Sequence, residues 1–176
     1  RKSENKLTVK ARVYDSNMKV KWDREEKINI KADCYQEVFK VPQLSDISTL
    51  YFVKLELVNE KGELVSDNVY WQSSKTPADY SGLAKLKEVK PDMSVKVNET
   101  KDEYQVVVKL KNTSKEISFM NRLAVVKKGT KEEILPTFWE DNFITLFPGE
   151  EKIVKASFSK KDVTGSDFSV ILDNNM

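Results

Sequence analysis

The sequence predicts an all-β protein that contains two antiparallel β-sandwiches in tandem. Three observations support this fold class. Apolar and polar side chains alternate in many short segments, which is typical of strands with one buried face. The glycines and four of the five prolines lie between those segments, where turns or domain boundaries are needed. No segment has the sustained periodicity of an amphipathic helix.

The first half contains five candidate strands. In residues 7–13 every second side chain is apolar, whereas lysine, threonine and arginine occupy the positions between them. The same alternation predicts strands at residues 18–22, 28–32, 50–58 and 63–71. The last two are joined by residues 59–62, which suit a hairpin because the glycine readily adopts positive φ.

Five strands are fewer than the roughly seven of a complete sandwich of the immunoglobulin type. We therefore expect the first sandwich to lack its N-terminal strand, which would leave residues 7–13 at an open sheet edge. Such an edge could pair with a second copy to form an edge-strand dimer of the fragment. A further strand hidden in residues 32–41 is the alternative.

The second half repeats the pattern with shorter spacing. Candidate strands lie at residues 93–97, 104–111, 122–126, 133–135, 143–147, 152–158 and 168–172. Seven short strands bounded by turn residues are typical of an immunoglobulin-like antiparallel sandwich.

A polar stretch with one proline separates the halves. We place the first sandwich at residues 1–74, a linker at 75–91 and the second sandwich at 92–176. Within the linker, residues 80–86 suit a short helical turn with Asp79 as its cap.

Composition excludes several classes of site. The 176 residues include no histidine, so a Ser-His-Asp triad, a Cys-His pair and a histidine-ligated zinc are all excluded. One cysteine, Cys34, cannot form an internal disulfide or a site with several thiolates. The 30 basic and 28 acidic side chains lack the basic excess of a nucleic-acid binder. No apolar run approaches the ~18 residues that insertion into a membrane requires.

No motif indicates a cofactor, a bound metal or a catalytic residue. A phosphate-binding loop and a calcium loop are both missing from the sequence. Neighbouring acids such as Glu140 and Asp141 could in principle hydrolyse a glycoside, but they are typical of solvated loops in which lysines are abundant. Trp139 lies in a loop-like stretch and is the best candidate for an exposed ring that stacks on a sugar. Packing in the core is the alternative for this ring.

Four segments, in order and spacing, resemble the C-terminal accessory region of glycoside hydrolase family 2, especially its exo-β-glucosaminidase and β-mannosidase-like members. They are residues 7–15, 67–73, 108–114 and 134–150. The last is the most specific, because it follows the pattern L-P-x-x-W-x-D-N and then P-G-E.

The resemblance implies a pair of sandwiches that follows a catalytic barrel, with no catalytic residue in this chain. The expected partner is that barrel in the parent chain, which the sandwiches would support. The parent would be periplasmic or secreted. Trp139, Asp141 and Asn142 would then be the positions that rim the active site or contact sugar. A carbohydrate-binding module for oligo- or polysaccharides and a cell-surface protein-interaction pair are the alternatives.

Overall fold

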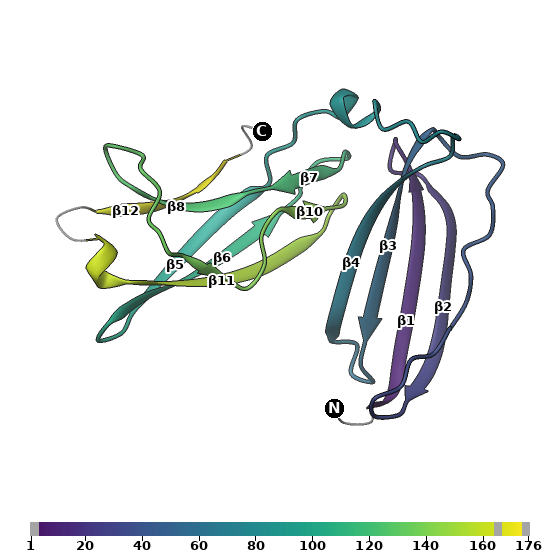
Figure 1. Ribbon diagram of the computed structural model, residues 1–176, viewed down its shortest axis with the longest axis horizontal. Coiled ribbons are helices and arrows are strands. Elements are labelled where there is room, and N and C mark those ends of the chain that lie inside the picture. Colours follow the sequence, from purple (N-terminus) through teal and green to yellow (C-terminus); the bar gives the residue numbers. More distant parts are fainter. Residues whose placement is uncertain (1–3, 164–166, 174–176) are drawn as a thin grey trace. The chain divides into compact units, whose positions relative to one another are not determined.

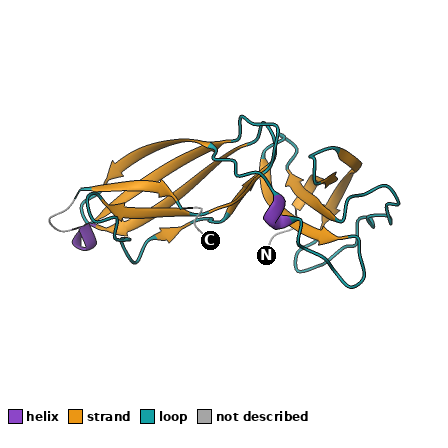
Figure 2. Cartoon of the chain, turned by 90° about the horizontal axis from the view of Figure 1, so that it is seen from above, coloured by secondary structure: helices purple, strands orange, loops and turns teal. Residues whose placement is uncertain are grey.

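The computed structural model describes residues 4–163 and 167–173, and almost all of its regular structure is antiparallel β-sheet (Figure 1). Within these residues, helix is confined to two short 3₁₀ turns (Figure 2). The chain divides into two compact units, residues 1–86 and 87–176. The predicted all-β class of immunoglobulin-like sandwiches is confirmed. Among the described residues, no helix has the length and apolar character that a membrane span requires.

The first unit contains one four-stranded antiparallel sheet with the strand order β2-β1-β3-β4. Its strands are β1 (Glu4–Asp15), β2 (Val20–Ile30), β3 (Leu50–Val58) and β4 (Leu64–Ser73). The β1–β2 turn is held by the Asp15 carboxylate, which accepts hydrogen bonds from the backbone N–H groups of Asn17 and Lys19, each at 2.9 Å. In the β3–β4 turn, Gly62 has a φ of 80°, which glycine adopts without strain.

Two expectations about these strands are wrong. Residues 18–22 and 28–32 do not form separate strands, because strand β2 continues through the charged residues between them. An edge strand tolerates such charges, and Glu25 lies 3.4 Å from Lys10 of the neighbouring strand. Residues 7–13 are not an open edge either, because β1 pairs with β2 on one side and β3 on the other. An edge-strand dimer would therefore have to use β2 or β4. Residues 32–41 contain no strand.

Apolar side chains are buried on both faces of this sheet, and Phe39 from the loop at residues 31–49 packs on the face that carries Val13. Val13 is aligned with Trp22 on one side and Val53 on the other, so these side chains share the face. The ring of Phe39 lies 5.9 Å from that of Trp22. The strands described in this unit thus form a single sheet, whereas a complete sandwich has two sheets.

The second unit has two layers. A four-stranded sheet has the order β5-β6-β11-β9, and the other layer consists of the two-stranded ribbons β12-β8 and β10-β7. The strands are β5 (Asp92–Glu99), β6 (Glu103–Lys111), β7 (Ser118–Asn121), β8 (Leu123–Lys127), β9 (Phe138–Trp139), β10 (Ile144–Leu146), β11 (Glu151–Ser159) and β12 (Phe168–Leu172). The strand predicted at residues 133–135 is reduced to a single bridge between Glu133 and Val126.

The core of the second unit lies between these layers. Alternate residues of β6, namely Val106, Val108 and Leu110, are fully buried there. At one end the rings of Tyr104, Phe158 and Phe168 lie with their centroids 4.9–5.7 Å apart. Offset and edge-on contacts of this kind add to the gain from apolar burial.

The last segment of the first unit is ordered by Asp79. Its carboxylate accepts hydrogen bonds from the Ser81 hydroxyl at 2.7 Å and the Ser81 N–H at 3.0 Å, and it forms an ion pair with Lys75. The 3₁₀ turn η1 (Leu83–Lys85) is preceded by Gly82, which is its N-cap residue. The prediction that Asp79 caps this turn is therefore wrong. A Cβ at Gly82 would lie 2.9 Å from the Cβ of Leu50, which explains why a glycine fits there.

Core burial predicts a strong contrast between two substitutions in the second unit. Leu110→Ala removes a fully buried side chain and should lower the free energy of unfolding by about 2–5 kcal/mol. Val97→Ala, at a half-exposed position of the edge strand β5, should cost less than about 1 kcal/mol. Urea unfolding measures both values, and similar losses would contradict the observed core.

The contacts of Asp79 predict a pH dependence. Hydrogen bonds from Ser81 and the ion pair with Lys75 hold the pKa of Asp79 well below its usual range. A carboxyl whose pKa is lowered by folding stabilises the fold above its unfolded pKa, and this contribution is lost as the pH falls toward the folded value. Asp79→Asn should therefore lower the melting temperature at pH 7, and the difference should narrow below the ordinary value of 3.8. Glu103→Gln, an exposed acid without side-chain contacts among the described residues, is the control, and a constant difference for Asp79→Asn would refute the account.

Candidate functional site

The segment at residues 134–150 carries the most specific sequence pattern, and it crosses between the two layers of the second unit. Ile134 is buried, and its carbonyl oxygen accepts a hydrogen bond from the Thr137 hydroxyl at 2.6 Å. The short strand β9 follows and pairs with β11 at Ala156 and Ser157. The chain then enters β10 in the opposite layer.

Trp139 and Phe138 point to opposite sides of β9. Trp139 is aligned with the buried Ala156 and packs against the core of the unit, where it is half-buried. Phe138 is aligned with Ser157 and faces outward, with 68% of its surface exposed. The most exposed ring of this segment is therefore that of Phe138, and Trp139, the ring expected from the sequence to be exposed, is half-buried.

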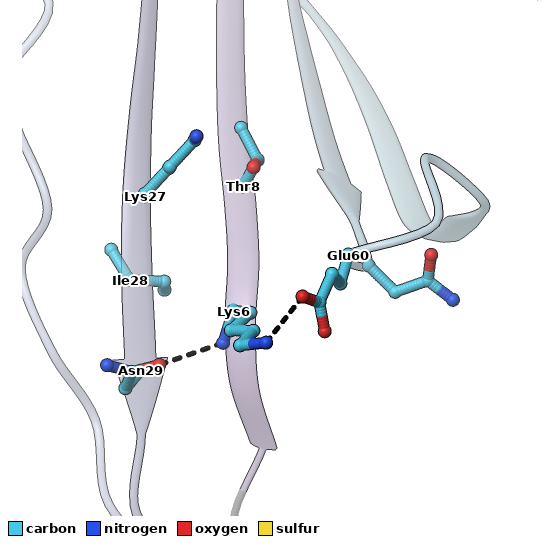
Figure 3. Close-up of a pocket in the computed structure, with 7 residues that line it drawn as sticks. Lys6, Thr8, Lys27, Ile28, Asn29 and Glu60 are labelled. Carbon is cyan, nitrogen blue, oxygen red and sulfur yellow. Dashed lines mark hydrogen bonds and ion pairs between the residues drawn. The ribbon is translucent and has the colours of Figure 1, made fainter.

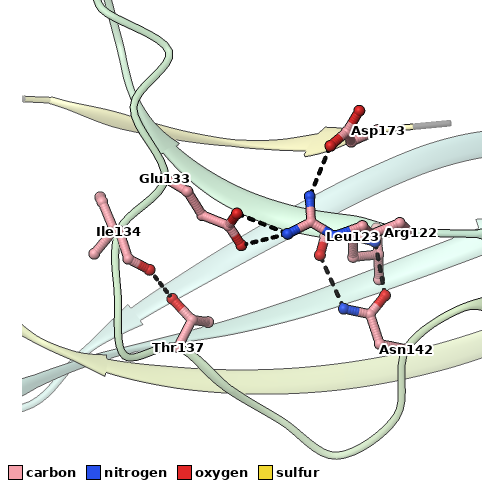
Figure 4. A network of polar contacts seen from close by, with 7 residues as sticks. All are labelled: Arg122, Leu123, Glu133, Ile134, Thr137, Asn142 and Asp173. Carbon is pink, nitrogen blue, oxygen red and sulfur yellow. Dashed lines mark hydrogen bonds and ion pairs between the residues drawn. The ribbon is translucent and has the colours of Figure 1, made fainter. Parts of the chain in front are cut away.

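Asn142 binds backbone and takes the place of a strand neighbour. Its Oδ1 accepts a hydrogen bond from the N–H of Leu123 at 2.7 Å, and its Nδ2 donates to the carbonyl oxygen of Leu123 at 2.9 Å (Figure 4). An amide side chain used in this way reproduces both bonds of a paired peptide group. It connects the segment to strand β8 at a point where no regular pairing is present.

Asp141 forms an ion pair with Lys152 of β11 at 2.8 Å, and both side chains are partly exposed. The three residues selected from the sequence thus have three different surroundings. Trp139 faces the core, Asp141 meets a lysine, and Asn142 holds the backbone of Leu123.

Two further asparagines have the same backbone-binding role, which no motif in the sequence indicates. Asn112 is fully buried, and its Nδ2 donates to the carbonyl oxygens of Glu116 at 2.8 Å and Leu146 at 2.9 Å. Asn121 is also fully buried and donates to the carbonyl oxygen of Ile144 at 2.8 Å. Their burial identifies this role in the structure, because a buried amide must find hydrogen-bond partners.

Arg122 is the centre of a charged network on the β8–β12 ribbon (Figure 4). Its guanidinium donates to both carboxylate oxygens of Glu133, at 2.9 and 2.7 Å, and to Asp173 at 2.7 Å. The hydrogen bond to Glu133 is the main cause that raises the pKa of Arg122. A hollow of about 630 Å³ adjoins the network. The two acids are bound to the same arginine, so this arrangement ties strand ends together and does not present two free carboxyls across a cleft.

A second hollow, of about 310 Å³, lies at one end of the first sheet (Figure 3). Its polar lining includes Lys6, Thr8, Lys27, Asn29 and Glu60. The backbone N–H of Lys6 donates to Asn29 Oδ1 at 2.8 Å, and its ammonium pairs with Glu60. Glu60 is the only acid in this lining, whereas hydrolysis of a glycoside usually requires two.

Metal binding finds no support in the described part of the chain, where no three acids or cysteines lie close enough together to hold an ion. The charged groups that the hollows contain are mainly paired lysines, arginines and acids.

Comparison with known proteins gives two family matches. Residues 68–174 match the family described as the exo-beta-D-glucosaminidase Ig-fold domain. Residues 1–74 match the family described as the mannosidase Ig/CBM-like domain.

Curated proteins that are similar to this chain are named exo-beta-D-glucosaminidase. An exo-beta-D-glucosaminidase of Arthroderma benhamiae is 33% identical over 132 residues, which cover 65% of this chain and 15% of that protein. One from Amycolatopsis orientalis is 34% identical over 150 residues, which cover 74% of this chain and 14% of that protein. The chain therefore spans only a small part of the length of these relatives.

Solved structures agree with this match. The crystal structure of the Amycolatopsis orientalis exo-chitosanase CsxA is similar with a TM-score of 0.89 and 27% identity, over 96% of this chain and 22% of that chain. A complex of a CsxA variant with PNP-beta-D-glucosamine gives a TM-score of 0.88.

The asparagine contacts predict a measurable cost of substitution. Asn142→Ala leaves the N–H and carbonyl of Leu123 without these partners and should lower the free energy of unfolding by about 1–3 kcal/mol. The control is Asn98→Ala at an exposed position of β5, which should change stability by less than about 0.5 kcal/mol. Chemical denaturation of the two variants measures the difference, and an unchanged stability of Asn142→Ala would show that the contact is not needed.

Proposed function

Because the chain belongs to the family of exo-β-D-glucosaminidase immunoglobulin-fold domains, we propose that it is a non-catalytic accessory region of a glycoside hydrolase family 2 β-glycosidase. Its role is to support the catalytic barrel of the parent chain and to contribute a wall near the active site. The chain itself breaks no glycosidic bond. Recognition of the sugar to be cleaved then depends on the barrel.

The observation that carries this proposal is the use of polar residues in residues 134–150. Asn142 binds the backbone of Leu123, and Asp141 pairs with Lys152. A catalytic pair requires two carboxyls on either side of the scissile bond, about 5–10 Å apart and free to exchange protons or attack. The side chains of this segment stabilise the fold instead.

The proportions of the relatives also favour an accessory role. The chain covers 22% of the CsxA chain, so about four-fifths of such a protein lies outside the similar part. A catalytic domain can occupy that remainder. Support of a neighbouring domain requires a rigid body, and a fully buried core with backbone-binding asparagines provides one.

A second candidate function is binding of carbohydrate by the chain itself. The observation that favours it is the exposed ring of Phe138 on the outer surface of the second unit. This function is compatible with an accessory role, since it requires no catalytic residue.

The accessory role predicts that the isolated chain does not hydrolyse 4-nitrophenyl β-D-glucosaminide or β-D-mannoside above the rate in buffer. Release of nitrophenol measures this, with a full-length glycosidase as the positive control. Activity that remains with the chain through purification, and that Glu140→Gln or Glu133→Gln abolishes, would overturn the proposal.

A further inference from the structure

The outer face of the four-stranded sheet in the second unit exposes apolar surface to water. Phe138 on β9 is 68% exposed and Ile153 on β11 is 56% exposed. Val107 on β6 lies on the same face and is half-buried. An exposed aromatic ring beside aliphatic side chains on a rigid sheet is a common feature of recognition surfaces.

Strand register places four side chains of this face in a row across the sheet. Asn98 of β5 is aligned with Gln105 of β6, Gln105 with Ser157 of β11, and Ser157 with Phe138 of β9. Aligned residues of antiparallel neighbours point to the same side. At the usual spacing of strands the row is roughly 14 Å long. We refer to Asn98, Gln105, Ser157 and Phe138 as the outer row.

The polar members of the outer row are available to a ligand. Within the described residues, the side chains of Asn98, Gln105 and Ser157 make no hydrogen bond or ion pair with another side chain or with backbone. A hollow of about 240 Å³ opens between Gln105, Phe138 and Ser157, and Val107 contributes to its lining. Two amides and a hydroxyl beside a flat ring combine hydrogen-bonding groups with an apolar platform.

This combination fits a saccharide. The C–H face of a pyranose is apolar and can stack on the ring of Phe138, while its hydroxyls can exchange hydrogen bonds with the amides of Asn98 and Gln105 and the hydroxyl of Ser157. The length of the row suits several linked sugars rather than one.

The charges around the outer row determine which class of saccharide this surface suits. Lys96 and Lys155 flank Val107 in the adjacent row, Glu103 lies beyond Gln105 on the same face, and Glu140 lines the hollow. Two ammonium groups and two carboxylates balance, so this surface gives no net attraction to a cationic or an anionic chain, and it suits an uncharged chain.

We propose that the outer row binds an uncharged oligosaccharide, of the N-acetylglucosamine or glucose type, by stacking on Phe138 and hydrogen bonding to the two amides and the hydroxyl. The choice of a saccharide over other uncharged ligands rests partly on the proposed function. In the parent protein such a surface would hold acetylated stretches of a polymer while the catalytic domain acts on others.

The test is calorimetric titration of the chain with (N-acetylglucosamine)₆ and cellohexaose. We expect binding, with affinity lowered about tenfold by Phe138→Ala and about three- to tenfold by Gln105→Ala. The matched control is Phe143→Ala, which removes another exposed ring, 42% exposed, outside the row and should leave affinity unchanged. Circular dichroism establishes that each variant is folded.

Three results would overturn the inference. The first is that neither uncharged hexasaccharide binds at millimolar concentration. The second is that Phe138→Ala and Phe143→Ala lower the affinity equally. The third is that fully deacetylated chitohexaose binds more tightly than its acetylated form. The nitrophenyl assay is independent of these results. Failure of sugar binding without hydrolysis leaves the accessory role in place, whereas hydrolysis by the isolated chain contradicts that role whatever binds to the row.

Discussion

The pairing of β11 with β6 is the interaction on which the second unit depends. It aligns nine residue pairs, from Glu151 with Lys111 to Ser159 with Glu103. Because side chains alternate across a strand, this register directs Val154 and Ala156 into the core and places Ser157 on the outer face. A slip of one residue would exchange the two faces. The buried core and the outer row therefore depend on the same set of backbone hydrogen bonds.

The opposite layer meets a different constraint, since its strands are short and form two separate ribbons. Backbone groups near the ends of such strands still need partners. Asn112, Asn121 and Asn142 supply them by binding the carbonyl or N–H groups of residues 19 to 34 positions away. Arg122 joins the same layer through Glu133 and Asp173. These polar side chains are thus used to complete the fold.

Local alternation predicted the long strands of the second unit, and residues 104–111, 152–158 and 168–172 lie within or coincide with β6, β11 and β12, whereas the short strands β7 and β9 were not predicted. Properties that depend on distant residues could not be read from it. The charged residues 23–26 were expected to separate two strands, because the sequence does not reveal that β2 is an edge strand, which tolerates such charges. The orientation of Trp139 depends on its alignment with Ala156, and the role of Asn142 depends on Leu123. The resemblance selected residues 134–150 by their pattern, whereas the strand register determines which ring of β9 faces the core and which faces outward.

The central claim is that no ionisable group of this chain takes part in bond cleavage. The most direct measurement replaces each Asp and Glu of these residues by Asn and Gln in a full-length glycosidase that contains them, and compares kcat on a glucosaminide substrate. We expect every folded variant to retain kcat within about tenfold, because a catalytic acid or base typically contributes 10²–10⁴-fold. A single folded variant that loses activity by about a hundredfold or more would contradict the account.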